Sequence, residues 1–135
     1  GHMTEHRYLE CFSHATDEIM RQAGVDDAYI AAGGSFFTVE THICHIDEVM
    51  ADAPIYVDTQ ILSVAGKKMR LFHRLYDKSG TLLATGEHML LHVDMTQRRA
   101  SQPTASVAAK LAKMAAGHAT LAMPDAAGRA VGMTL

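Results

Sequence analysis

The chain has 135 residues, enough for one domain with its own hydrophobic core. A formal net charge of −3 gives no reason to expect a nucleic acid as partner, and no apolar run approaches the roughly 20 residues that span a membrane. The two cysteines lack the spacing of metal ligands, which favours reduced thiols and a cytoplasmic protein without structural disulfides.

A helix is predicted over residues 4–23. Apolar side chains such as Tyr8 and Phe12 recur at helical spacing, and charged residues fall on the opposite face. Thr4 suits the N-cap, and Gly24 suits the position just after the last turn. We therefore expect an amphipathic helix with one buried face.

Strands are predicted where the apolar period changes from helical to alternating, over residues 35–49, 55–65, 68–76 and 82–95, after a short helical turn at 27–32. In the first strand, Phe37 and Val39 are expected to share the core face with Ile43. Glu40 and His42 are expected on the other face.

After Pro103, the alanine-rich segment 104–118 is predicted to be helical, and the tail to Leu135 has no firm pattern. One long helix followed by four antiparallel strands indicates an α+β fold in which the sheet buries the helix. We divide the chain into a domain over residues 1–102 and a helix and tail over 103–135 that pack on the same domain.

Several polar residues of the predicted strands could carry chemistry. Glu87 alternates with apolar residues, and a carboxylate on an apolar face needs a partner or a function. Acidic and histidine side chains also gather along the first strand, namely Glu40, His42, His45, Asp47 and Glu48. The nine histidines of the chain form no compact ligand motif, so no metal site is predicted.

The first residues carry a resemblance to a known family. Gly1-His2-Met3, followed by Tyr8 and Leu9, resembles the GHMNNxxYL segment that opens the central helix of hot-dog-fold acyl-CoA thioesterases, the family of 4-hydroxybenzoyl-CoA thioesterase. The resemblance implies a hot-dog fold, a long central helix wrapped by an antiparallel sheet. In that family a first strand and a catalytic carboxylate precede this glycine, and both are missing from the given chain. The alternative is that the first three residues remain from tag removal.

The resemblance implies thioester hydrolysis, which needs a base or nucleophile and donors for the oxyanion. The expected catalytic residues are His2, Glu5 and, as second choice for acid–base work, Glu87. The expected oxyanion donors are the backbone N–H groups of Met3 and Thr4, although an ordinary helix end would look the same. The expected substrate pocket comprises Tyr8, Phe12, Phe36 and Glu40. Coenzyme A phosphates are expected at Lys67, Lys68 and Arg70.

Two further segments, THICHIDEV and GEHMLLHVDMTQR, narrow the resemblance. They look like the thioesterase domains found beside or fused to L-carnitine dehydrogenase, which implies betainyl-CoA as substrate and glycine betaine as product. The family also implies a homodimer or tetramer with active sites between subunits, and no cofactor beyond the coenzyme A of the substrate. Two alternatives remain open: an acyl-CoA hydratase or dehydratase, and a non-catalytic domain that binds acyl-CoA or dimerises a fused dehydrogenase.

Overall fold

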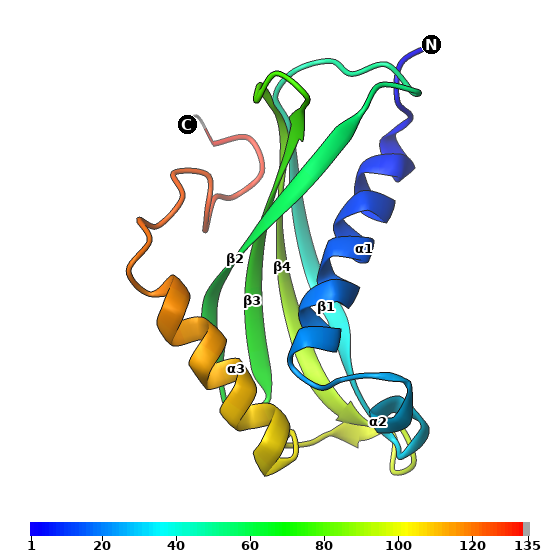
Figure 1. Ribbon diagram of the computed structural model, residues 1–135, viewed down its shortest axis with the longest axis vertical. Coiled ribbons are helices and arrows are strands. Elements are labelled where there is room, and N and C mark those ends of the chain that lie inside the picture. The colour runs from blue at the N-terminus through cyan, green and yellow to red at the C-terminus, as the bar shows by residue number, and fades with distance from the viewer. Residues whose placement is uncertain (134–135) are drawn as a thin grey trace.

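One long helix lies across one face of an antiparallel sheet in the computed structural model, which describes residues 1–133 (Figure 1). The elements in chain order are α1 (Glu5–Gln22), α2 (Asp27–Ala31), β1 (Gly34–His45), β2 (Ile55–Ala65), β3 (Lys68–Asp77), β4 (Leu82–Asp94), β5 (Arg99–Ala100) and α3 (Ala105–His118). This arrangement confirms the predicted α+β class, the long helix and the four long strands.

The sheet has the order β1-β4-β3-β2, and the two-residue strand β5 pairs with the end of β4. All of these pairings are antiparallel. β5 was not predicted, because a strand of two residues has no alternation to detect. Within the described residues, no helix combines the length and the apolar character needed to cross a bilayer.

The buried face of α1 packs closely on the sheet. Phe12 is fully buried, and a Cβ atom added to Gly86 of β4 would lie 2.7 Å from its ring. Glycine at position 86 therefore lets the helix and the sheet approach each other. The helix ends as predicted, with Gly24 at a φ angle of +92° that glycine adopts without strain.

β1 differs from the predicted strand in where it ends and in which of its side chains face the core. It ends at His45 instead of Val49, and a β-bulge interrupts its pairing with β4 between Thr38 and Glu40. Ile43 packs against the core as expected, but Phe37 and Val39 are 50% and 58% exposed. The extra residue at the bulge changes which side chains face the core, so strict alternation counted from Ile43 places the earlier residues on the wrong face.

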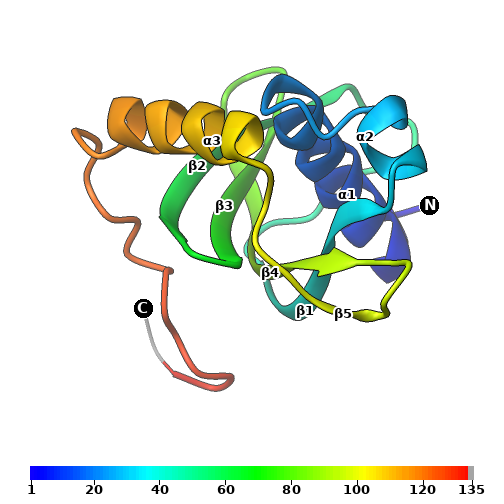
Figure 2. The same cartoon turned by 90° about the horizontal axis from the view of Figure 1, so that it is seen from below.

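The C-terminal segment contacts both faces of the sheet. Val107 and Leu111 of α3 pack into the core cluster beside the C-terminal half of α1. The chain then crosses to the face opposite α1 (Figure 2), where Gln60 Nε2 donates to the carbonyl of Ala122 at 3.2 Å. The last two residues of the predicted tail, Thr134 and Leu135, lie outside the described residues.

Candidate active site

A cleft lies beside the start of α1. Residues 1–3 pair with the connection between β1 and β2: Met3 N–H donates to the carbonyl of Val49 at 2.8 Å, and Ala51 N–H donates to the carbonyl of Gly1 at 2.9 Å. The resulting cleft has a volume of about 320 Å³. Its walls are formed by His2, Tyr8, His45, Ile46, Asp47, Glu48 and Val49.

A histidine and a carboxylate meet in this cleft. His2 Nε2 lies 3.1 Å from Glu48 Oε2, and we call these residues the His2–Glu48 pair. Because an ionised carboxylate only accepts hydrogen bonds, His2 Nε2 is the donor, and in the neutral ring Nδ1 is left as an acceptor. Asp47 Oδ1 accepts from the backbone N–H of Glu48 at 2.8 Å, which holds the turn that presents Glu48. The pair can therefore take a proton from water.

The start of α1 supplies free donors. Thr4 occupies the N-cap position as predicted, but its side chain makes no capping hydrogen bond. The first-turn N–H groups of Glu5 and His6 have no partner within residues 1–133, so they can bind an anion. Met3 differs from the expectation, because its N–H is already engaged with Val49. The Glu5 side chain is exposed at the same helix end.

Two of the expected pocket residues belong to the core. Tyr8 lines the cleft. Phe12 lies between α1 and the sheet, and Phe36 packs edge-on to His92, with ring centroids 5.0 Å apart. Neither of these phenylalanines lines the cleft. Helical spacing identified Phe12 as buried but could not distinguish a core position from a pocket wall.

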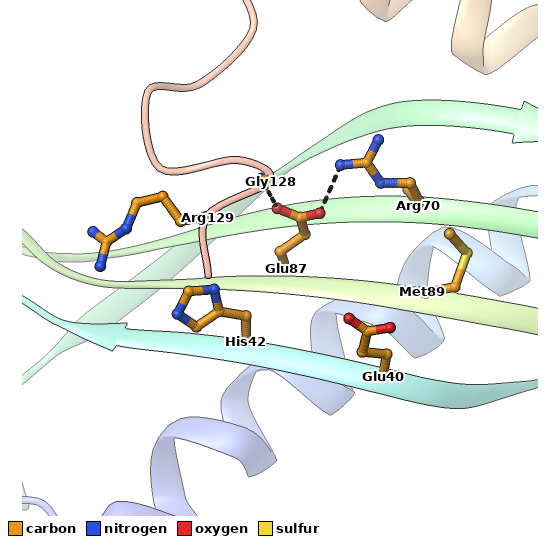
Figure 3. A pocket seen from close by; sticks show the side chains of 7 residues that line it. All are labelled: Glu40, His42, Arg70, Glu87, Met89, Gly128 and Arg129. Carbon is orange, nitrogen blue, oxygen red and sulfur yellow. Dashed lines mark hydrogen bonds and ion pairs between the residues drawn. The ribbon is translucent and has the colours of Figure 1, made fainter. Parts of the chain in front are cut away.

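Glu87 and Glu40 lie on the other face of the sheet (Figure 3). Glu87 Oε2 accepts from Arg70 Nη2 at 2.7 Å, and Oε1 accepts from the N–H of Gly128 at 2.6 Å. Through these two hydrogen bonds Glu87 fixes the tail on the sheet. The carboxylate of Glu87 thus has the partner that the sequence analysis expected it to need. The structure does not bring Glu87 together with His2 and Glu5.

The expected phosphate ligands are also separated from the cleft. Lys67 lies in the turn between β2 and β3, and Lys68 begins β3, at the end of the sheet opposite the start of α1 (Figure 1). Both are exposed and form no ion pair within the described residues. Arg70 instead pairs with Glu87.

Sequence reasoning missed Glu48 and Asp47 as cleft residues. The predicted strand runs through them to Val49, and its acidic and histidine residues were interpreted as having a structural or interface role in preference to a metal site. Within residues 1–133, no group of three or more His, Cys, Asp and Glu side chains is placed to hold a metal ion. The signal that could have found them is the acidic run Asp47-Glu48 directly after the apolar residue Ile46, where a strand gives way to a polar loop.

Known proteins that are similar to this chain are described as thioesterases. A family model described as the thioesterase-like superfamily matches residues 1–111. The betainyl-CoA thioesterase of Pseudomonas aeruginosa is 37% identical over 135 residues, which cover 98% of this chain and 85% of that protein. The L-carnitine dehydrogenase/betainyl-CoA thioesterase of Ruegeria pomeroyi is 50% identical over 131 residues, or 97% of this chain. The chain spans only 27% of the length of that bifunctional relative.

Solved structures show the same fold. A putative thioesterase from Pseudomonas putida KT2440 matches with a TM-score of 0.82 and 29% identity, covering 100% of this chain and 87% of that one. A hypothetical protein from Staphylococcus aureus, solved in complex with CoA, matches with a TM-score of 0.89 and 22% identity, covering 98% and 85%. The expected hot-dog architecture is thus confirmed.

Proposed function

Because the chain belongs to the thioesterase-like superfamily, we propose that the cleft at the start of α1 hydrolyses an acyl-CoA thioester. The observation that carries this proposal is the His2–Glu48 pair, which lies in the cleft beside the uncapped start of α1. A proton acceptor and free N–H donors are the two requirements of thioester hydrolysis. No observation favours the hydratase or the non-catalytic alternative.

The reaction would proceed in two steps. His2 Nδ1 accepts a proton as the oxygen of water bonds to the thioester carbon, and the carbonyl electron pair moves onto oxygen beside the N–H groups of Glu5 and His6. The C–S bond then breaks, and His2 returns the proton to the leaving sulfur. The products are a carboxylic acid and coenzyme A. Glu48 holds the imidazole in position and stabilises its charged form.

Betainyl-CoA is the proposed substrate, with glycine betaine and coenzyme A as products. The names of the relatives suggest it, and the charge of the cleft suits it. Asp47 and Glu48 place two carboxylates beside the rings of Tyr8 and His45. Carboxylates and aromatic rings both attract a quaternary ammonium group. We also propose that the protein acts in the cytoplasm, fused or adjacent to an L-carnitine dehydrogenase, and that it needs no cofactor.

We propose a homodimer formed across β1, or a tetramer made of two such dimers. The edge of β2 is partly covered, because Ile61 N–H donates to His118 Nδ1 of α3 at 2.8 Å. β1 has no neighbour on its outer edge within the described residues, and its exposed Phe37 and Val39 lie there. Antiparallel pairing of two β1 strands would turn one subunit end for end. Lys67 and Lys68 of the second copy would then lie toward the cleft end of the first, where they would meet coenzyme A phosphates.

The test of the His2–Glu48 pair is the substitution Glu48→Gln. Glutamine keeps the size of the side chain but cannot stabilise the imidazolium that forms when His2 takes a proton, so we expect kcat for betainyl-CoA to fall about 10²-fold. The matched control is Glu10→Gln, which removes an exposed carboxylate paired with Arg7 on α1 and should leave kcat unchanged. Full activity of the Glu48→Gln enzyme would exclude the pair as the base.

A further inference from the structure

Tyr8 combines a buried ring with an unsatisfied hydroxyl. Its side chain is only 6% exposed and packs in a core cluster with Met3, Phe12 and Val49. His45 stands edge-on against the ring, with centroids 4.6 Å apart. These contacts fix the ring, so the direction of the hydroxyl is fixed as well.

The hydroxyl of Tyr8 has no protein partner. Within residues 1–133 no group forms a hydrogen bond with it, and it is not among the polar atoms sealed from solvent. Tyr8 lines the cleft that contains Glu48. A tyrosine hydroxyl on a buried ring ordinarily has a partner, so an unpartnered hydroxyl on a residue that lines a cleft is available to a bound molecule.

The surroundings keep this hydroxyl protonated. Burial is the main reason that the pKa of Tyr8 lies above its usual value, and Coulombic interactions with Cys11 and Glu48 raise it further. A neutral phenol donates a hydrogen bond throughout the physiological pH range. The cleft therefore contains a fixed side-chain donor in addition to the backbone donors of α1.

We infer that Tyr8 is a catalytic residue, whose hydroxyl donates a hydrogen bond to the thioester oxygen as that oxygen becomes negative. The inference rests on the proposed hydrolysis and adds a side-chain donor to the backbone donors at the start of α1. Tyr8 keeps its proton throughout: the water proton goes to His2, and from there to the leaving sulfur. A donor held rigidly by the core needs no reorganisation when the charge develops, and this is what makes such donors effective.

The test is Tyr8→Phe, measured with betainyl-CoA and a thiol reagent. Phenylalanine keeps the packing of the ring, so the denaturation midpoint should stay near that of the wild type. Loss of an oxyanion donor should lower kcat by about 10²- to 10³-fold with KM changed only a few-fold. The control is Tyr56→Phe, because Tyr56 lies on the other face of the sheet, stacked on Tyr76, and its loss should not change kcat.

The outcomes separate this inference from the proposed function. A Tyr8→Phe enzyme with wild-type kcat would overturn the inference while leaving the thioesterase in place. A rise in KM with kcat unchanged would also overturn it, because Tyr8 would then be a pocket wall. If the wild-type protein releases no coenzyme A from any acyl-CoA, the proposed function fails and the inference falls with it.

Discussion

At the scale of single residues, His73 shows how the core holds a polar group. It is fully buried beneath α1, with Thr16 Oγ1 2.9 Å from Nε2 and Thr59 Oγ1 2.7 Å from Nδ1. The hydroxyl hydrogen of Thr16 is directed to the carbonyl of Phe12, so His73 Nε2 donates to Thr16. In the neutral ring, which burial favours, Nδ1 then accepts from the hydroxyl of Thr59.

The buried His73 should make stability depend on pH. Burial, assisted by the neighbouring His88, lowers the pKa of His73 from 6.5 to about 3. Below pH 6.5 the unfolded chain therefore binds a proton that the folded chain does not, and the free energy of unfolding decreases as the pH falls from 6.5 toward 3. We expect His73→Leu to weaken this dependence, measured as guanidinium midpoints between pH 7 and 4.

A matched substitution tests the assignment. His14 is exposed on α1, so His14→Leu removes a histidine that lies outside the core, and it should retain the wild-type pH dependence. A His73→Leu protein with an unchanged pH dependence would show that the buried ring is not the source. His88 and His92 also have pKa values lowered by burial, so part of the dependence should remain in His73→Leu.

At the scale of elements, α1 and β1 show what a sequence can predict. The spacing of apolar residues located each end of α1 to within one residue, because the pattern of a helix that covers one face needs no information from the rest of the chain. β1 was found, but its bulge reversed the expected faces of Phe37 and Val39. A bulge depends on how β1 pairs with β4, forty and more residues away, and local alternation does not contain that information.

The candidate site, too, could be predicted from the sequence only in part. His2 and the helix start were predicted, because they lie in one continuous motif. Glu48 was missed as a catalytic candidate, because only the paired backbone of residues 1–3 and 49–51 brings it to His2. Glu87 was predicted as catalytic from its apolar neighbours. Glu87 is remote from the cleft because it lies on the face of the sheet opposite α1. The sequence alone does not show which face of β4 packs against α1, since that depends on the register between β4 and its neighbouring strands.

The open edge of β1 should determine the oligomeric state. We expect Val39→Lys to convert the proposed dimer to a monomer in sedimentation equilibrium, since a lysine on an edge strand opposes the approach of a second strand. The control is Val131→Lys, because Val131 is 90% exposed and belongs to the tail, outside every strand of the sheet. A Val39→Lys protein that is still dimeric would place the interface on another surface.

At the scale of the whole molecule, the sheet separates two different surfaces. One face carries α1 and, at its start, the cleft. The other face carries the tail, fixed by the hydrogen bond from Gly128 to Glu87. Charge is also divided along the length of the sheet, with Asp47 and Glu48 at the cleft end and Lys67 and Lys68 at the opposite end. A substrate with a cationic acyl group and a polyanionic nucleotide matches this division once two subunits lie end for end.

The most direct measurement of the central claim is the release of coenzyme A by the wild-type protein from two substrates, betainyl-CoA and its uncharged isostere 3,3-dimethylbutyryl-CoA. The two acyl groups have the same shape and differ in the ammonium charge. We expect kcat/KM to be at least about tenfold higher for betainyl-CoA, because a cation gains more than about 1.4 kcal/mol from the carboxylates and rings of the cleft. Equal values for the two substrates, or no release from betainyl-CoA, would contradict the account.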